Sequence, residues 1–409
     1  MPETTPRSAV SVPLLITLAL LSTAAPFATD LYLSAFPAMT ADLGTTAAGV
    51  QLSLTAFLLG AGIGQLVFGP LSDRMGRYGP LLIGLALYIA ASAAAALAPT
   101  ITALIVARLV QGLAGSAGMV IGRAIISDLA HGAEAARAMA IMMLVGGIAP
   151  IVAPFAGSLL AEPLGWRGLL WIVTGVGIVT VPLVLLFVRE THPRTVREQH
   201  RTHASAPDAR LLSRRYLGFA GAFAFGFATL MAYISASPFL YQSMMGFTEV
   251  QYGLAFALNA IALTASSIVG TRLTHRVSVA RLLQVGLLWN LGAILALLVL
   301  VLANVPAIWL ALPIVAAVAS VGLVLGNATA LALDVVRSRA GTGSAWLGFL
   351  QFSLAGLVSP LVGIGGEDTA MPLALTMLAA SIVANAAFLI ARGAPERGRN
   401  PQPQLPATT

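Results

Sequence analysis

The chain has 409 residues, of which 58% are hydrophobic and only 9% are charged, and its mean hydropathy is +0.90. Soluble domains carry about 25% charged residues, so a soluble domain of this composition could not cover its surface with polar groups. Composition therefore excludes a soluble globular enzyme. It predicts a polytopic α-helical membrane protein, whose outer surface faces lipid.

The formal net charge of +7 comes entirely from arginine, because all 22 basic residues are Arg and none is Lys. Two explanations stay open: a codon bias that favours Arg, and selection for Arg at anionic lipid. Without Lys the chain has neither a Walker A loop nor a Lys Schiff base. Without Cys it has no disulfide, no thiolate zinc site and no Cys nucleophile.

Twelve apolar runs are each long enough to cross a bilayer, which takes about 20 residues. They begin near Val12, Gly49, Pro80, Thr102, Arg137, Trp166, Tyr216, Val250, Val279, Pro306, Thr342 and Met371. The first run is longer than the apolar region of a cleaved signal peptide, which is about 7–15 residues. The predicted fold class is all-α, with twelve transmembrane helices.

A polar, basic segment in the middle of the chain divides six predicted spans from six. The predicted parts are an N-terminal tail (1–11), a six-helix half (12–188), a linker (189–215), a second six-helix half (216–393) and a C-terminal tail (394–409).

The two halves share a weak internal repeat. The first span ends in Ser34-Ala35-Phe36-Pro37 and the seventh in Ser235-Ala236-Ser237-Pro238, while the fourth and tenth end at Asp128 and Asp334. Two similar six-helix halves predict a transporter whose substrate site lies between them, near the midplane of the membrane.

Arginines fall almost entirely on one side of the predicted topology. Among the loops on the opposite side only Arg167 carries positive charge, and Arg108 and Arg123 lie within a span. Because cytoplasmic loops carry the excess of Lys and Arg, both termini are predicted to be cytoplasmic.

Three segments carry recognisable motifs: Gly69–Arg77 (GPLSDRMGR), Arg108–Gly115 (RLVQGLAG) and Gly147–Gly157 (GIAPIVAPFAG). With these residues the chain resembles the major facilitator superfamily. More closely, it resembles the Bcr/CflA group of drug:proton antiporters, as do the segment Asp30–Pro37 and the stretch from Gly326 to Asp334. The resemblance covers nearly the whole chain outside the tails. It implies a multi-pass protein of the bacterial cytoplasmic membrane, with alternating access between the two halves.

The loop between the second and third spans contains two glycines, Gly69 and Gly76, which would permit a tight turn with positive φ. Asp73 could lie at the N-terminus of a neighbouring helix, where a negative charge is stabilised. The resemblance implies that Asp73, an arginine of this loop and Asp128 form a charge latch. The alternative is that the arginines only anchor the topology. The predicted latch residues are Gly69, Asp73, Arg74, Gly76, Arg77 and Asp128.

Arg108 lies several residues inside the fourth span, where a charged side chain costs about 2.5–3.5 kcal/mol on insertion scales. It should therefore face polar partners inside the bundle, and the resemblance implies a part in proton coupling. The alternative is that its long side chain reaches the membrane interface.

Asp30 is the only carboxylate placed within the first span. An isolated carboxyl away from water favours its neutral form, so it could bind and release a proton as the cavity opens to either side. The resemblance implies the same role. The alternative is an ordinary acid at the helix end, a few residues before Pro37. Related exporters carry a second acid two turns earlier. Here that position is Ser22, which favours a single proton site.

In the fifth span, Pro150 and Pro154 remove backbone donors and would kink the helix. Gly147 and Gly157 would let neighbouring helices approach closely. The resemblance identifies this segment as the antiporter motif, whereas ordinary helix packing is the alternative.

A cavity of mixed polarity would need a few polar groups among apolar ones. The candidate lining residues are Tyr32, Phe36, Tyr233, Asn259, Asn327 and Gln351. Hydrogen bonding between helices is the alternative role for each.

Together these observations predict proton-coupled export of small, partly hydrophobic compounds, and the resemblance points to bicyclomycin- or chloramphenicol-type antibiotics. The expected partners are the drug, protons and the lipid bilayer, with no nucleic acid, no metal and no cofactor beyond the proton gradient. The chain is expected to act as a monomer. One alternative is a proton-coupled metabolite transporter. The other is a membrane scaffold or enzyme, which no zincin pair, nucleophile elbow or phosphate loop supports.

Overall fold

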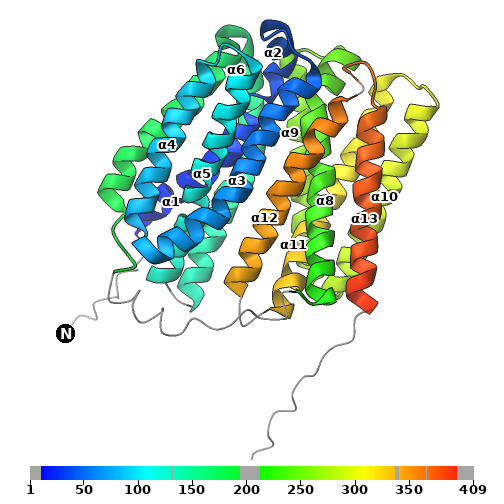
Figure 1. Cartoon of the computed structure of the whole chain (residues 1–409). Coiled ribbons are helices and arrows are strands. Elements are labelled where there is room, and N and C mark those ends of the chain that lie inside the picture. The colour runs from blue at the N-terminus through cyan, green and yellow to red at the C-terminus, as the bar shows by residue number, and fades with distance from the viewer. Residues whose placement is uncertain (1–10, 131, 194–211, 337–339, 365, 394–409) are drawn as a thin grey trace, which may run out of the picture.

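The computed structural model describes residues 11–130, 132–193, 212–336, 340–364 and 366–393. All regular elements in these ranges are helices, and they form two bundles that stand side by side (Figure 1). In the first bundle, called the N half, the helices are α1 (Val12–Asp30), α2 (Phe36–Asp42), α3 (Ala47–Met75), α4 (Tyr78–Ala96), α5 (Ile101–Leu129) and α6 (Gly132–Phe187).

The second bundle, called the C half, follows the predicted linker, of which residues 194–211 lie outside the described part of the chain. Its helices are α8 (Arg214–Pro238), α9 (Glu249–Leu273), α10 (Val279–Leu302), α11 (Ala311–Val335), α12 (Ala340–Val358) and α13 (Met371–Gly393). Three short irregular segments, η1 (Leu33–Ala35), η3 (Phe239–Met244) and η6 (Ser359–Gly363), adjoin the ends of α1, α8 and α12.

Helix α6 contains 56 residues because two membrane crossings are joined at a sharp turn, where Gly165 has φ 64°. Length and composition alone give 11 candidate spans in the described residues, with residues 148–187 counted once. Divided at Gly165, they give twelve crossings, so the predicted twelve-helix fold is confirmed. The helix continues through Pro150 and Pro154, and its non-helical φ/ψ is at Gly165.

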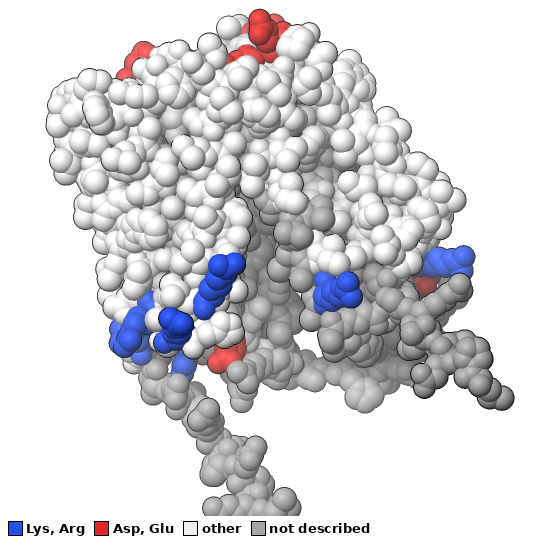
Figure 2. Space-filling model, turned by 180° about the vertical axis from the view of Figure 1, so that it is seen from behind, with Lys and Arg blue, Asp and Glu red and all other residues white. Residues whose placement is uncertain are grey.

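Charge distinguishes the two ends of the molecule. In the view of Figure 2 the blue Arg side chains lie along the lower rim, while the upper rim carries acidic side chains. The lower end, where α3 ends and α8 begins, is called the Arg-rich end, and the opposite end the Arg-poor end. Between the two ends, large apolar side chains such as Ile83, Leu87 and Val106 are exposed, as lipid contact requires.

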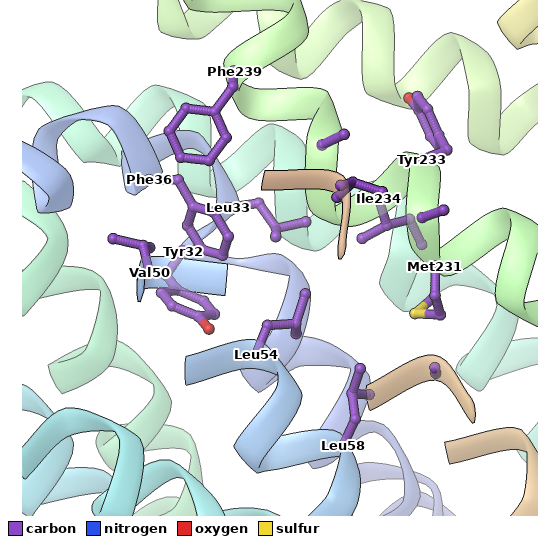
Figure 3. Packing of buried hydrophobic residues seen from close by; sticks show 14 of the residues in the cluster. Tyr32, Leu33, Phe36, Val50, Leu54, Leu58, Met231, Tyr233, Ile234 and Phe239 are labelled. Atoms are coloured by element: carbon purple, nitrogen blue, oxygen red, sulfur yellow. The ribbon is translucent and has the colours of Figure 1, made fainter. Parts of the chain in front are cut away.

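Buried apolar residues form three clusters among the described residues. One joins both halves, with Leu54 and Leu58 of α3 packed near Met231 and Ile234 of α8 (Figure 3). The other two lie toward the Arg-rich end, one inside the N half and one inside the C half. The described apolar core therefore joins the halves toward the Arg-poor end, while each half has its own core toward the Arg-rich end.

Candidate functional site

Arg108 is completely buried within α5, so its side chain does not reach the membrane interface. Its guanidinium carbon lies 4.5 Å from the ring centre of Tyr32 and 4.4 Å from that of Phe57. A cation between two aromatic faces is stabilised by the ring quadrupoles, by about 2 kcal/mol when water is excluded. The alternative of interfacial placement is therefore wrong.

One chain of hydrogen bonds extends from Arg108 into α4. Its Nη1 donates to Gln111 Oε1 at 2.6 Å, and Gln111 Nε2 donates to Ser92 Oγ at 2.6 Å. The other guanidinium nitrogens, Nε and Nη2, have no protein partner in the described structure. Arg108 is thus a buried positive charge held by aromatic faces and one amide, with donor capacity left over.

Close packing of α3 against α5 places these groups. A Cβ atom at Gly112 would collide with the Phe57 carbonyl oxygen, and one at Gly60 would collide with the Leu109 carbonyl oxygen. These glycines let the two backbones approach until Phe57 covers the guanidinium of Arg108, one turn from Gly112. Small residues have this use in membrane helices generally.

Asp30 is the last residue of α1 and is buried, with 6% of its surface exposed. The hydroxyl of Thr29 donates to its Oδ1 at 2.9 Å. Ion pairs in the described residues do not include Asp30. The segment that follows it, η1, contacts α8 and α9 of the C half. Asp30 is therefore not a solvated acid at a helix end, but a buried carboxyl beside the other half.

The antiporter-motif glycine Gly157 contacts the segment that holds Asp30. A Cβ at Gly157 would collide with the carbonyl of Leu31, the residue after Asp30. The side chains of residues 143–147 lie outside the described structure, so the predicted role of Gly147 stays a prediction. Gly157 therefore sets how closely α6 approaches the end of α1.

At the Arg-rich end the structure brings the predicted latch groups together around Arg77. Its Nη1 lies 2.5 Å from Asp73 Oδ1, and its Nε lies 2.9 Å from Asp128 Oδ2. Burial disfavours the charge of Arg77, but the hydrogen bonds to Asp128 and Asp73 outweigh it and hold its pKa above the usual value. Arg77 is thus the arginine that joins Asp73 to Asp128, while Arg74 is exposed and its place in the latch stays a prediction.

Glu190, which follows α6, completes this cluster and was missed by sequence reasoning. Its Oε1 accepts the backbone N–H of Arg77 at 2.9 Å, and its Oε2 accepts that of Tyr78 at 3.2 Å. A carboxylate at a helix N-terminus satisfies orphan N–H groups and favours the helix dipole. Glu190 therefore caps α4 and ties the end of α6 to the latch.

The two latch glycines are unlike one another. Gly76 has φ 96°, and a Cβ there would collide with the carboxylate of Glu190. The predicted left-handed turn is wrong for Gly69, which lies inside α3, where a Cβ would make only ordinary contact. The helix continues through Pro70, although proline lacks an N–H donor, because membrane helices tolerate proline where neighbouring groups satisfy the freed carbonyl.

Another arginine joins loops at the Arg-poor end of the N half. Arg167 Nη1 lies 2.5 Å from Asp42 Oδ2, and its Nη2 donates to the Ala98 carbonyl at 3.3 Å. The indole of Trp166 donates to the same Asp42 oxygen at 2.9 Å. Three loops of the N half are therefore held together by Arg167 and its neighbour.

The six predicted cavity residues are not gathered into one cavity. Tyr32 contacts Arg108, and Phe36 lies against Phe239 at 6.2 Å between ring centres. Asn259 donates to Tyr241 in an aromatic cluster of the C half, to which Tyr233 belongs through its stacking on Phe256.

The last two members of that set lie apart from those groups. Asn327 bonds to the Leu323 carbonyl of its own helix, and Gln351 is partly exposed on α12. The drug-contact role of all six stays a prediction.

Comparison with known proteins gives the family. A model of the Major Facilitator Superfamily matches residues 18–360. The chain belongs to the Major Facilitator Superfamily. It is therefore a membrane transporter rather than an enzyme.

Several curated relatives match over nearly their full length. The chain is 34% identical to an uncharacterized MFS-type transporter, YdgK, of Bacillus subtilis, over 91% of this chain and 93% of that one. It is 29% identical to a bicyclomycin resistance protein homolog of Haemophilus influenzae, with coverage of 94% and 98%. It is 28% identical to the multidrug resistance protein MdtL of Klebsiella pneumoniae, with coverage of 89% and 92%.

Solved structures share the fold at low sequence identity. A bacterial homolog of the human lysosomal transporter Spinster, in an inward-facing and occupied conformation, superposes with a TM-score of 0.74 at 19% identity, covering 92% of this chain and 96% of that one. A D-xylose–proton symporter gives a TM-score of 0.73 at 13% identity, with coverage of 94% and 98%. These likenesses show the fold.

Gly76→Ala is expected to destabilise the protein for two reasons, the positive φ and the collision with Glu190. In a Glu190→Ala background the collision is gone, so the second cost should disappear and the two changes should be non-additive. Thermal unfolding in detergent measures this, and coupled neighbours typically differ from additivity by about 0.5–3 kcal/mol. Gly79→Ala, where a Cβ would meet nothing within 4 Å, is the matched control. Strictly additive effects would contradict the assigned contact.

Gly157→Ala is expected to push α6 away from α1, because the added methyl meets a backbone carbonyl that cannot rotate aside. Overpacking of this kind costs roughly 1–3 kcal/mol. The apparent melting midpoint in detergent should fall clearly below that of Gly175→Ala, a change at a position with open space in the crossing of α6 that follows Gly165. Equal midpoints for the two variants would show that the approach at Gly157 is not tight.

Proposed function

We propose that this transporter exports small, partly hydrophobic compounds from the bacterial cytoplasm in exchange for protons. The observation that carries the proposal is Asp30, a buried carboxyl without an ion-pair partner among the described residues, at the end of α1. An intramembrane carboxylate of this kind marks a proton or substrate pathway by default. Nothing else in the described interior of the N half offers a buried carboxyl. Asp42, Asp73, Asp128 and Glu190 belong to the loop clusters at the two ends, and Glu162 is exposed.

Asp30 lies where both halves meet. Its neighbour Leu31 packs on Gly157 of the antiporter motif, and η1, the segment that follows, contacts α8 and α9 of the C half. A change in its protonation therefore alters a charge at the interface that must separate and close during transport. Charge changes at such interfaces bias two-state elements.

Arg108 supplies a fixed positive charge in the same half. Its guanidinium contacts Tyr32, two residues after Asp30, and keeps two nitrogens without a protein partner. We assign it the task of holding water or substrate polar groups near the proton site and favouring proton release from Asp30. It does so without an ion pair, so Asp30 remains able to accept a proton.

The orientation follows from charge, with the Arg-rich end and both termini in the cytoplasm. The described core then corresponds to a state closed to the outside, because the halves are joined at the Arg-poor end. The latch around Arg77 belongs to the cytoplasmic face, where it biases one of the two states. A proton taken up by Asp30 from outside favours drug release, and its return to the cytoplasm accompanies drug binding. The electrical part of the driving force is about 2.3 kcal/mol per charge per 100 mV.

The substrate class rests on the relatives. The named proteins from Haemophilus and Klebsiella are called bicyclomycin and multidrug resistance proteins. Along with the fifth-span motif, these names favour export of antibiotics over uptake of a metabolite. The proposal assigns the chain to the Bcr/CflA group and to a monomer, with no cofactor beyond the proton gradient.

Asp30→Asn is expected to insert and fold but to lose proton-driven efflux, because an amide cannot release a proton. An efflux-deficient bacterium expressing the chain should show raised resistance to one or a few compounds from a varied antibiotic panel, and this resistance should vanish in the variant. Asp30→Glu should retain part of it. The matched control is Asp368→Asn, which makes the same change at an exposed position.

Full resistance in Asp30→Asn would refute the role of Asp30. No resistance to any compound from the unaltered chain, with the protein present in the membrane, would favour the metabolite transporter.

A further inference from the structure

Two backbone carbonyls in corresponding places of the internal repeat accept hydrogen bonds from the opposite half. Gln242 Nε2, in η3 of the C half, donates to the Ser34 carbonyl of the N half at 2.8 Å. Gln51 Nε2, in α3 of the N half, donates to the Ser235 carbonyl of the C half at 3.0 Å. Ser34 and Ser235 both begin Ser-Ala-x-Pro segments. In each half, therefore, the serine carbonyl of the repeat accepts a hydrogen bond from a glutamine of the other half.

Proline removes one local donor from each of these carbonyls. In each segment the residue three positions after the serine is proline, Pro37 or Pro238, which has no N–H to donate. At Ser235 the next possible donor, the N–H of Phe239, bonds to the Ala236 carbonyl instead. An open carbonyl inside a membrane protein needs a partner from elsewhere, and a side-chain amide supplies one.

Apolar and polar contacts surround the two bonds. Phe36 and Phe239 lie against each other across the halves (Figure 3), at 6.2 Å between ring centres. The hydroxyls of Ser235 and Ser359 lie 2.6 Å apart. This set of contacts lies toward the Arg-poor end, where the described apolar core joins the halves.

We propose that Gln51 and Gln242 are gate residues whose hydrogen bonds hold the Arg-poor end closed. The inference rests on the alternating access of the proposed function, since both bonds join groups that must separate when that end opens. Breaking either bond leaves a backbone carbonyl without its amide partner. Each bond therefore stabilises the closed state relative to the open one.

The two bonds differ in strength. Gln51 is 1% exposed, whereas Gln242 is partly exposed. Water can replace the Gln242 amide at Ser34 more readily than it can replace the Gln51 amide at Ser235. Loss of Gln51 therefore opens the gate further than loss of Gln242, because an unmade buried hydrogen bond costs more.

The absence of cysteine from the chain makes a direct test simple, because one introduced Cys is the only thiol. Ala232→Cys places it on α8, one turn deeper than Ser235 and fully buried. A membrane-impermeant maleimide added outside intact cells reaches it only when the gate opens. Gln51→Leu and Gln242→Leu should each raise the labelling rate about two- to tenfold, the range for one hydrogen bond, with Gln51→Leu the larger.

Matched controls separate gate opening from general damage. Gln284→Leu removes a glutamine that bonds to Arg392 within the C half and should leave labelling unchanged. A reporter at Ala95, buried in α4 of the N half, should stay unlabelled in every variant. If Ala232→Cys does not fold, Ala236→Cys serves instead.

Unchanged labelling at the gate reporter in both glutamine variants would overturn the proposal. Labelling that rises equally at Ala95 would also overturn it, because it would report unfolding. The assay needs neither drug nor proton gradient, so its failure is distinguishable from failure of the proposed efflux.

Discussion

A charge inside a membrane protein has to be stabilised by something other than water, and the N half is arranged around that requirement. Arg108 obtains its stabilisation from the faces of Tyr32 and Phe57 and from one amide rather than from a carboxylate. Because the arginine does not depend on Asp30 for neutralisation, the carboxyl is free for the proton binding that we propose. A direct ion pair between the two would stabilise the charged form of each and oppose proton uptake.

Close backbone packing at glycines fixes the distances between the helices that carry Asp30 and Arg108. Gly60 and Gly112 bring α3 onto α5, and Gly157 brings α6 onto the residue after Asp30. At these points a side-chain atom would have to occupy the place of a backbone carbonyl. The glycines therefore act by fixing the distance between helices, and the chemistry of Asp30 and Arg108 depends on distances that residues elsewhere in the chain determine.

Local sequence was sufficient for the fold and for part of the site. Span length, the central linker and the arginine distribution predicted twelve helices, because every span needs about 20 apolar residues to cross the lipid. The burial of Asp30 and Arg108 was predictable for the same reason. Glu190 was not, since its effect comes from N–H groups 112 and 113 residues earlier in the chain. Gln51 and Gln242 were missed because no local sequence pattern predicts which distant carbonyl a glutamine in a membrane helix will bind.

The two arginines that join loops in the N half have a mechanical consequence. Arg77, with Glu190, connects the α3–α4 turn to the ends of α5 and α6, and Arg167 connects three loops at the opposite end. These contacts tether the ends of the helices of this half to one another. We expect the N half to move as a unit, with local rearrangement in the short segments η1, η3 and η6, each of which contacts the opposite half. Irregular helical turns of this kind are common hinges. The N half, which would rotate as a unit, is thus distinct from the short segments η1, η3 and η6, which would bend.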